Sequence, residues 1–490
     1  MKESQPIENL IANRKEKLEK LRIAGIEPYP SNFSYTHTTF DIHKEFDSLS
    51  PGVVADKKIR VCGRIITRRI MGKATFSDIF NSTGKVQIYV KKDTVGGDSF
   101  EIFLNLIDIG DFIGVEGEPF KTRTGELTIN VSRWQLLSKS LRPLPEKWHG
   151  LKDVETRYRQ RYLDLISNEN VRKTFQIRAK IITAVREYLD REEFLEVETP
   201  MIQYLAGGAL ARPFKTFHNT YNIELFLRIA PELALKMLTV GGLEKIYELG
   251  RSFRNEGIDR QHNPEFTMVE IYKAYSDYND MMALCEGMLL HIIKANGSGE
   301  EITYGDKKIS FKIPFKKASL QELFQQVLNK DIMKIIAEGN LKNLADELKI
   351  KRTGEESDRN IFDHIFDEYI KNKLIDPTFI LDYPLEFSPL AKGKSGCPIA
   401  ERFELFIAGE EVANAYSELN DPQEQKERFA RQRKDAEVHP LDEGFITALE
   451  YGMPPCGGLG IGIDRLTMIL TNSSSIREVI LFPLLRPEEK

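Results

Sequence analysis

The spacing of apolar and polar residues changes along this chain and divides it into stretches with different predicted structures. In residues 7–24, apolar side chains recur at helical intervals among lysine, arginine and glutamate, which predicts one amphipathic helix ended by Pro28 and Pro30. In residues 59–137, short alternating stretches are separated by turn residues. Several strands so close together, with few helical windows, indicate a small closed β-barrel.

After a proline-containing linker the pattern becomes mixed. A helical stretch leads into LEVETPMIQ, a predicted strand ended by Pro200, and Pro231 lies where a first helical turn tolerates proline. Further on, a charged and largely helical stretch reads as an insertion between two parts of a site. The chain is therefore predicted to be α+β, with an N-terminal helical extension (1–55), a barrel domain (56–140), the linker (141–155) and a large domain (156–490) that carries the insertion at about 299–372.

Composition adds limits to this picture. With 490 residues, 41% hydrophobic and 29% charged, the chain has the make-up of a soluble protein of two or more domains. No stretch approaches the roughly 18 apolar residues of a membrane helix, and the charged start lacks the apolar core of a signal peptide. We therefore expect a cytoplasmic protein without a membrane partner. The four cysteines lie far apart, without zinc or redox spacing, and the net charge of −5 neither demands nor excludes a nucleic acid.

The most informative stretch is FRNEGIDRQHNPEFTMVEIYKAY, residues 253–275, predicted as two strands joined by a polar loop. Strand side chains alternate between faces, so the first strand would carry Arg254 and Glu256 on one face. The second would place Phe266, Glu270 and Tyr272 together. A guanidinium, two carboxylates, a phenol and an aromatic ring suit a nucleotide beside a small charged molecule. The alternative is a solvated outer face of the sheet.

A second stretch, GGLGIGIDR, is predicted as a glycine-rich strand that enters a helix. Its glycines would let a ligand or another backbone approach closely. Arg465 lies at the helix start, where its charge opposes the helix dipole, so an anion between the two would explain it. A tight packing turn between strand and helix is an equally good interpretation, because the glycines do not follow the dinucleotide fingerprint.

A third stretch, RFELFIAGEEVANAYSELND, is predicted as a hairpin with its turn at residues 408–409. Glu404 and Glu411 would then share a face, and two carboxylates so placed suit Mg²⁺ that holds phosphates. Regular alternation puts Asn414, Tyr416 and Glu418 on the opposite face. One pocket can include all five only if a bulge separates Glu411 from Asn414.

The three stretches LEVETPMIQ, FRNEGIDRQHNPEFTMVEIYKAY and GLGIGIDRLTMIL resemble the signature motifs of class II aminoacyl-tRNA synthetases. GGALARPFKT, LRIAPELALK, NAYSELND and REVILFPLLRP narrow the resemblance to lysyl-tRNA synthetases of the bacterial type. It covers nearly the whole chain and is weakest at residues 299–372. It implies an OB-fold anticodon-binding barrel and a class II catalytic domain built on an antiparallel sheet flanked by helices. It also implies a homodimer that joins L-lysine to tRNA(Lys) with ATP and Mg²⁺.

The resemblance assigns roles to matching residues. Arg254 would bridge the lysine carboxylate and the α-phosphate, and with Arg465 it would be catalytic. The ATP-binding residues would be Arg254, Glu256, His262, Phe266 and Arg465. Mg²⁺ would bind Glu404 and Glu411. The α-ammonium of lysine would meet Glu270 and the backbone of Gly208, and its ε-ammonium would meet Glu232, Tyr272 and Glu418, with Asn414 and Tyr416 completing the pocket. The anticodon would meet Arg69, Phe76, Gln87 and Glu126.

Elementary chemistry agrees with the lysine assignment. A buried ammonium must be paired, and two carboxylates with a phenol offer three acceptors for its three N–H donors. In the barrel, Arg64, Arg68, Arg69 and Lys73 precede Phe76, as in single-strand RNA-binding surfaces. Without the family resemblance, Phe76 would be assigned to the barrel core.

Two other functional classes compete with the ligase. A relative that lysylates a protein would be expected to lack the N-terminal barrel. A regulatory RNA-binding protein would be expected to have lost Arg254, Arg465 or the carboxylates Glu404 and Glu411. This chain has the barrel and all of these residues.

Overall fold

The computed structural model describes residues 6–145, 151, 153–205, 207–208, 211–352, 356–435 and 442–488. The chain divides into two compact units, residues 1–150 and 151–490. Of the predicted linker at 141–155, residues 146–150 and 152 lie outside the described part. The same holds for two residues of the GGALARPFKT stretch, Ala209 and Leu210.

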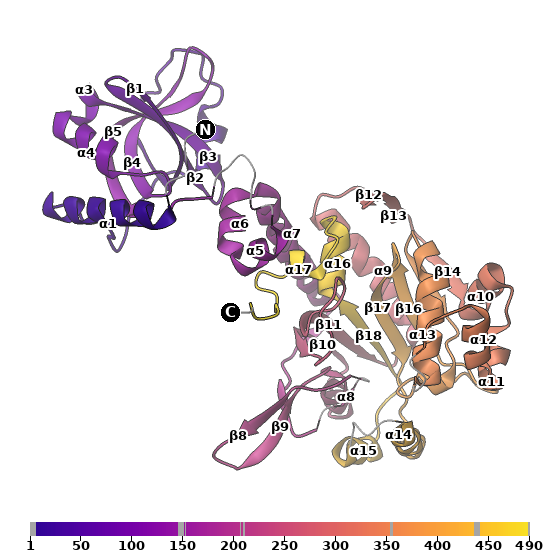
Figure 1. Cartoon of the computed structure of the whole chain (residues 1–490). Coiled ribbons are helices and arrows are strands. Elements are labelled where there is room, and N and C mark those ends of the chain that lie inside the picture. Colours follow the sequence, from indigo (N-terminus) through magenta and orange to yellow (C-terminus); the bar gives the residue numbers. More distant parts are fainter. Residues whose placement is uncertain are drawn as a thin grey trace. The chain divides into compact units, whose positions relative to one another are not determined.

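The first unit is the predicted closed barrel, with strand order β1-β2-β3-β5-β4 and β1 paired to β4 (Figure 1). Its core consists of inward-facing residues such as Val61, Ile79 and Ile88 at every second position. The strands are β1 (Ile59–Met71), β2 (Ala74–Asn81), β3 (Gly84–Lys91), β4 (Phe112–Lys121) and β5 (Leu127–Ser138). The helices are α1 (Ile7–Ile23), α2 (Thr39–Phe46), α3 (Lys92–Val95) and α4 (Gly97–Leu106).

The sequence pattern does not predict helix α4, because its apolar residues lie within the strand-rich stretch 59–137. Phe100 and Phe103 of α4 are buried in the barrel core. The ring of Trp134 packs edge-on against Phe103 at 5.3 Å between centroids. The helix therefore contributes apolar surface to the barrel in place of a further strand.

The second unit is built on an eight-stranded sheet with the order β14-β15-β16-β17-β18-β11-β10-β6. Its inner pairs are antiparallel, and only the edge pairs β14–β15 and β6–β10 are parallel. The strands are β6 (Leu195–Glu196), β10 (Lys245–Phe253), β11 (Glu265–Ala274), β14 (Lys316–Ser319), β15 (Thr378–Leu381), β16 (Arg402–Ile407), β17 (Glu410–Ser417) and β18 (Cys456–Gly462).

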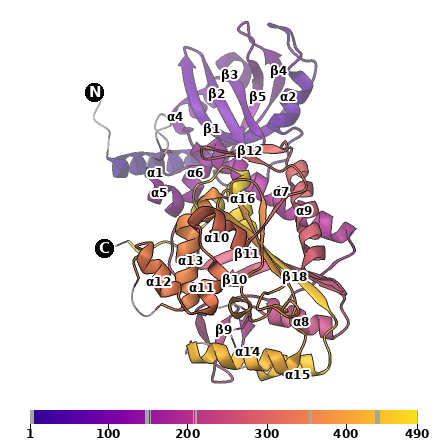
Figure 2. The same ribbon diagram turned by 90° about the vertical axis from the view of Figure 1, so that its right-hand side faces the viewer.

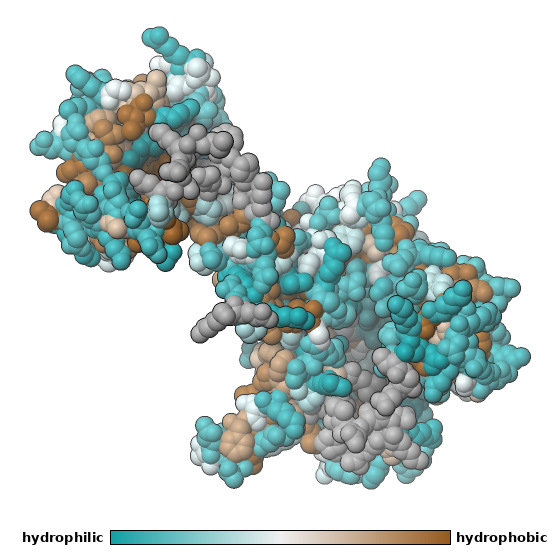
Figure 3. All heavy atoms as spheres, viewed as in Figure 1, coloured by the Kyte–Doolittle hydropathy of each residue, from teal (hydrophilic) through white to brown (hydrophobic). Residues whose placement is uncertain are grey.

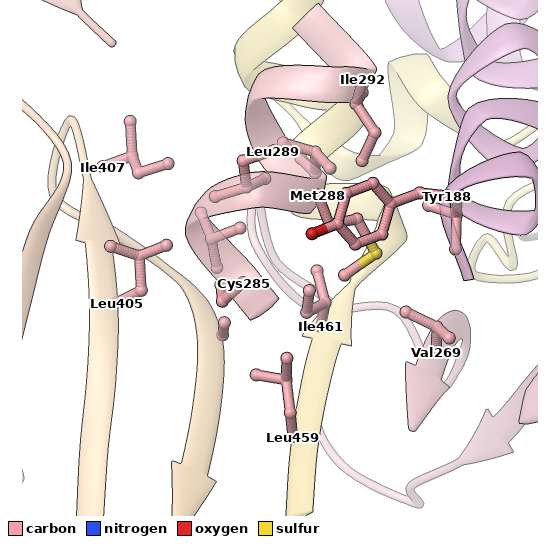
Figure 4. Packing of buried hydrophobic residues seen from close by; sticks show 14 of the residues in the cluster. Tyr188, Val269, Cys285, Met288, Leu289, Ile292, Leu405, Ile407, Leu459 and Ile461 are labelled. Atoms are coloured by element: carbon pink, nitrogen blue, oxygen red, sulfur yellow. The ribbon is translucent and has the colours of Figure 1, made fainter. Parts of the chain in front are cut away.

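One face of this sheet is apolar and packs on helices, among them α7 (Glu169–Arg191), α9 (Tyr278–Ala295) and α16 (Ile463–Leu470). Figure 4 shows Met288 and Leu289 of α9 next to Leu459 and Ile461 of β18. The opposite face carries the alternate residues of the same strands, including Glu270, which is one place along from the buried Val269. An antiparallel sheet needs only one apolar face for its core, so the other is available for polar chemistry.

Other elements surround this polar face. In Figure 2, helices α10 to α13 lie on the side of the strands away from α9. Helix α8 begins at Glu232. The remaining elements are α5 (Val154–Arg159), α6 (Arg161–Ser167), β7 (Ile202–Gln203), β8 (Lys215–His218), β9 (Ile223–Leu227), α8 (Glu232–Val240), β12 (Glu301–Tyr304), β13 (Lys307–Ser310), α10 (Leu320–Leu328), α11 (Ile332–Ala337), α12 (Leu341–Glu347), α13 (Asp358–Tyr369), η1 (Lys371–Lys373), η2 (Leu385–Phe387), α14 (Pro422–Asp435), α15 (Glu443–Glu450) and α17 (Ile476–Val479).

Three local expectations differ from the structure. β10 ends at Phe253, so Arg254 and Glu256 lie in the loop beyond it, although the Arg254 N–H still donates to the Pro264 carbonyl at 2.8 Å. LEVETPMIQ forms two short strands in different sheets, and between them the backbone N–H and hydroxyl of Thr199 donate to the side-chain carboxylate of Glu248 on β10. In its described residues, the stretch at 299–372 contains helices α10 to α13, but it also contributes the hairpin β12–β13 and the edge strand β14.

The visible surface in Figure 3 is mostly hydrophilic, with scattered apolar patches. In the part of the chain that the structure describes, every helix is too short or too polar to cross a membrane.

Candidate active site

One cavity of about 1750 Å³ opens on the polar face of the sheet. It is lined by β11, β16, β17 and β18, by the start of α8, by the loop after β10 and by α13. Every site residue predicted for the second unit lines it: Gly208, Glu232, Arg254, Glu256, His262, Phe266, Glu270, Tyr272, Glu404, Glu411, Asn414, Tyr416, Glu418 and Arg465. Residues from five separate stretches of sequence are thus brought to one place.

The bulge that the hairpin required is present. Ala408 and Gly409 form the turn with positive φ values of 56° and 86°. Phe406 pairs with Glu411 but Leu405 pairs with Ala413, so Val412 is the extra residue. Beyond the bulge Glu404 pairs with Asn414, which places both on the cavity face together with Glu411.

The glycines of β18 allow a close approach of side chains to the sheet. A Cβ added to Gly458 would lie 1.9 Å from Glu418 Oε1 and 2.9 Å from a ring carbon of Tyr272. Gly458 pairs with Tyr272 on one side and with Tyr416 on the other. The space above this glycine is therefore part of the pocket, and the alternative of a plain packing turn does not account for it.

One end of the cavity is strongly acidic. Glu232, Glu270 and Glu418 are all buried there. The Tyr416 hydroxyl donates to Glu232 Oε1 at 2.6 Å, and the Tyr272 hydroxyl donates to Glu270 Oε2 at 3.3 Å. Burial and the charge of Glu232 together raise the pKa of Glu270 to about 8. Burial also raises the pKa of Glu418 well above its ordinary value. Three carboxylates so close together favour a cation.

Sequence reasoning missed a cation already at this end. Lys236 lies one turn after Glu232 on α8, and its side chain is completely buried. Its Nζ lies 2.7 Å from Glu232 Oε1 and also forms an ion pair with Glu418 Oε2. The Glu–Lys pair at i and i+4 in PELALK was the available signal, but such pairs are common on exposed helix surfaces.

The other end of the cavity carries arginines and an aromatic ring. The Arg254 guanidinium lies 5.0 Å from the centre of the half-buried Phe266 ring. Burial lowers the pKa of Arg254, and the nearby charges of Glu256 and Glu411 oppose that shift. Arg465 donates to the Glu411 backbone carbonyl at 2.9 Å, and its other terminal nitrogen lies 3.4 Å from His262 Nε2. This end suits an anion beside a planar ring.

The proposed metal ligands, Glu404 and Glu411, line the same cavity. Tyr383 donates to Glu404 Oε2 at 2.7 Å, and Arg402 pairs with Oε1 of the same carboxylate. Glu411 pairs with Arg465 at 3.3 Å. Burial and the charge of Glu411 raise the pKa of Glu404 to about 7, against the lowering effect of the Arg402 charge. Two mutually repelling carboxylates fit a divalent cation. Because no three such ligands gather among the described residues, phosphate oxygens and water would complete its shell.

A further contact that the sequence did not reveal holds the arginine end in place. Asp464, next to Arg465, is buried and accepts from the Thr267 backbone N–H at 2.6 Å. It also pairs with Arg178 of α7 at 2.6 Å. One carboxylate therefore ties the third motif at α16 to the second motif at β11 and to helix α7, and fixes the strand that bears Phe266.

The barrel presents three of its four predicted binding residues at its surface, whereas Gln87 is buried. Arg69, Phe76 and Tyr89 stand side by side on β1, β2 and β3. Phe76 is half-buried and outside the core cluster, and its ring centroid lies 4.6 Å from that of Tyr89. Gln87 lies two residues before Tyr89 on β3, and its side-chain oxygen accepts a hydrogen bond from the Thr128 hydroxyl. Glu126 is exposed in the turn before β5.

Two basic residues of the predicted RNA surface have other partners. Arg64 donates to the Gly110 carbonyl at 2.9 Å and lies over the Phe112 ring. Arg68 donates to the Ile107 carbonyl at 2.6 Å, since the bulge in β1 turns it toward α4. Their guanidiniums hold the loop after α4, which leaves Arg69 and Lys73 as the exposed cations of this stretch.

Comparison with known proteins agrees with this geometry. A family model for class II tRNA synthetases (D, K and N) matches residues 153–486, and one for an OB-fold nucleic acid binding domain matches residues 59–137. The lysine–tRNA ligase of Carboxydothermus hydrogenoformans is 50% identical to this chain, over 99% of this chain and 100% of that protein. The chain belongs to the lysine–tRNA ligase family of class II tRNA synthetases.

Other members of the family align equally far. The lysine–tRNA ligase of Pelotomaculum thermopropionicum is 51% identical over 99% of this chain and 96% of that protein. That of Bacillus cereus is 50% identical over 97% of each. Family membership thus rests on both units of the chain and not on the catalytic motifs alone.

Proposed function

We propose that this lysine–tRNA ligase activates L-lysine at the acidic end of the cavity and ATP at the arginine end, and then transfers the lysyl group to the 3′ end of tRNA(Lys). The observation that carries the assignment is the buried group Glu232, Glu270 and Glu418 in the same cavity as Arg254 and Arg465. A dibasic amino acid with one carboxylate is complementary to both ends. Aspartate or asparagine would leave buried carboxylates unpaired.

The reaction needs no nucleophilic side chain. The lysine carboxylate oxygen attacks the α-phosphorus of ATP, the bond to the β-phosphate oxygen breaks, and pyrophosphate leaves. Arg254 would hold the attacking carboxylate and the α-phosphate together, while Phe266 and Arg465 would enclose the adenine. Glu256 would meet the adenine edge and His262 the outer phosphates. The site then lowers the activation barrier by positioning the two substrates and by stabilising the charge that develops between them.

The lysine substrate would use its two ammonium groups separately. Its α-ammonium would meet Glu270 and the backbone of Gly208, which has φ +88° at the cavity wall. Its ε-ammonium would meet Glu232, Tyr272 and Glu418. Asn414, whose side-chain oxygen accepts from Arg402 at 3.2 Å, and Tyr416 would complete the pocket.

Glu404 and Glu411 would hold Mg²⁺, which supplies charge neutralisation for the phosphates. Arg402 and Tyr383 each contact the Glu404 carboxylate and so fix its orientation. Arg465 would exchange part of its contact with Glu411 for ATP.

Glu404→Gln is expected to lose the Mg²⁺-dependent part of the ATP affinity. Titration of ATP binding with and without Mg²⁺ tests this pair of carboxylates.

Lysine affinity is expected to rise with pH. Since the ligand-free pKa of Glu270 is about 8, this carboxyl is mostly protonated at pH 7, whereas the bound ammonium requires it ionised. Binding therefore releases a proton, and the association constant should rise about tenfold from pH 6.5 to 8 and then level off. Calorimetry in buffers of different ionisation enthalpy measures that proton. An affinity that is constant or falls over this range would contradict the assignment.

The barrel is proposed to bind the anticodon through Arg69, Phe76, Gln87 and Glu126, with Phe76 stacking on a base. Phe76→Ala is expected to lower aminoacylation about tenfold or more through the KM for tRNA, because stacking contributes roughly 1–3 kcal/mol per base. Lysine-dependent pyrophosphate exchange should remain unchanged. Phe40→Ala, which removes an exposed ring from α2, is the control. A parallel fall in exchange would mean that Phe76 serves folding.

We also propose a homodimer, as the family resemblance implies. In support, an apolar groove of about 670 Å³ is lined by Phe175 of α7, Phe253 of β10 and the C-terminal residues 480–484. Phe482 in this segment is 70% exposed, which is unusual for a residue of that size. Sedimentation of the purified protein as a monomer would contradict the proposal.

A cytoplasmic location and the domain division at residues 55, 140 and 155 are proposed as well. All four cysteines are free, as expected in a reducing compartment. Recovery of the protein with membranes after cell fractionation would contradict the location. Limited proteolysis that failed to cut near residues 141–155 would argue against the linker.

A further inference from the structure

Lys236 occupies a position that the reaction as described does not explain. Its side chain is completely buried, and its Nζ bridges Glu232 and Glu418. These are two of the carboxylates assigned to the substrate ε-ammonium. Its ammonium also lies 5.5 Å from the centre of the Tyr416 ring and 6.0 Å from that of Phe445. An internal lysine thus stands at the wall of a pocket proposed for lysine.

The charges at this end can be compared with those of the substrate. Glu232, Glu270 and Glu418 carry three negative charges when ionised, and Lys236 compensates one of them. Two negative charges remain, and lysine brings two ammonium groups. The substrate carboxylate is left for Arg254 at the other end. An amino acid with only one ammonium group would leave at least one carboxylate uncompensated in a buried site, which is strongly unfavourable.

We propose that Lys236 is a positioning residue that fixes the carboxylates of Glu232 and Glu418 and sets the charge of the pocket to match a substrate with two ammonium groups. The proposal rests on the assignment of the acidic end to lysine. A plain stabilising pair along α8 would need only Glu232, whereas Lys236 also reaches Glu418 on the far strand segment after β17.

The titratable groups that face Lys236 come from several elements. They are Glu232 of α8, Glu270 of β11, Tyr416 of β17, Glu418 after it and Cys456 of β18. The positive charge of Lys236 holds down the pKa values of Glu270 and Glu418 against the effect of burial. Without that charge both carboxyls would bind protons up to a higher pH. An ammonium ligand requires them ionised, so the loss of Lys236 is visible in a pH profile.

The test is the pH dependence of kcat/KM for lysine in pyrophosphate exchange, with Lys236→Met, Glu418→Gln and the double variant compared with the unchanged enzyme. Lys236→Met adds one uncompensated carboxylate and should move the acidic limb of the profile up by about one pH unit. Glu418→Gln should move it down. The double variant has the same net charge as the unchanged pocket. The acidic limb of its pH profile should therefore return close to the original position, although its KM for lysine is higher.

The KM for ATP should change less than threefold in all three variants. Lys245→Met is the matched control, since Lys245 also makes an ion pair but lies outside the cavity. A limb that does not move in Lys236→Met, or that stays displaced in the double variant, would overturn the charge-setting role. If neither Lys236 variant melts cooperatively, Lys236 is a stability residue and the proposal is also overturned. Absence of lysine-dependent exchange in the unchanged enzyme would instead refute the proposed function.

Discussion

Arg254→Ala is expected to reduce lysine-dependent pyrophosphate exchange by about 10³-fold, with most of the loss in kcat. The half-buried Arg254 places its guanidinium 5.0 Å from the centre of the Phe266 ring, and its buried Nε has no hydrogen-bond partner among the described atoms. A hydrogen-bond donor positioned beside charge that develops in the transition state contributes about 10²–10³ in rate. Here one residue would contact both the lysine carboxylate and the α-phosphate of ATP. Arg254→Lys should recover little, because an ammonium cannot make the paired contacts of a guanidinium.

The matched control is Arg251→Ala, on β10 three residues before Arg254. Arg251 is 40% exposed, pairs with Glu265 at 3.6 Å and does not line the active-site cavity. Exposed pairs of this kind contribute about 0–1 kcal/mol, so exchange should stay within a few-fold of the original rate. Equal losses in the two variants, or a loss confined to the KM for lysine, would contradict the bridging role of Arg254.

Glu418→Gln is expected to raise the KM for lysine by about 10²-fold while the KM for ATP changes little. Glu418 is almost completely buried, with 1% of its surface exposed, and it lies at the end of the cavity away from Arg465. The substitution keeps the shape of the side chain but removes one charge that faces the ε-ammonium. Loss of one partner in a buried, charged hydrogen bond costs about 2–5 kcal/mol.

Steady-state exchange with each substrate varied in turn separates the two KM values. Glu443→Gln, an exposed carboxylate at the start of α15, is the control and should leave both unchanged. Similar increases in both KM values for Glu418→Gln would show a general disturbance of the cavity. That result would refute the placement of the ε-ammonium beside Glu418.

Much of the fold could be predicted because it depends on local patterns. The alternating stretches of residues 59–137 form the closed barrel, and the turn at Ala408–Gly409 forms as expected. Helix α4 and the edge strand β14 were missed, because short elements leave few periods in the sequence. The end of β10 was placed at least three residues too late, since nothing local distinguishes Arg254 in the strand from Arg254 in the loop.

The site residues that follow the alternation of a strand, such as Glu270 and Tyr272, could be grouped before the structure was known. The bulge at Val412 could be stated only as a condition, because two registers of the hairpin were open. Partners from distant parts of the chain could not be found at all. Lys236 bridging to Glu418 and Asp464 bound to Arg178 depend on how separate elements meet in space.

The most direct test of the central claim is lysine-dependent exchange of labelled pyrophosphate into ATP, measured with lysine, ornithine, arginine, aspartate and asparagine in parallel. The account predicts exchange with lysine, much weaker exchange with ornithine, which is shorter by one methylene, and none with aspartate or asparagine. Exchange supported by aspartate or asparagine, or none with lysine, would contradict it.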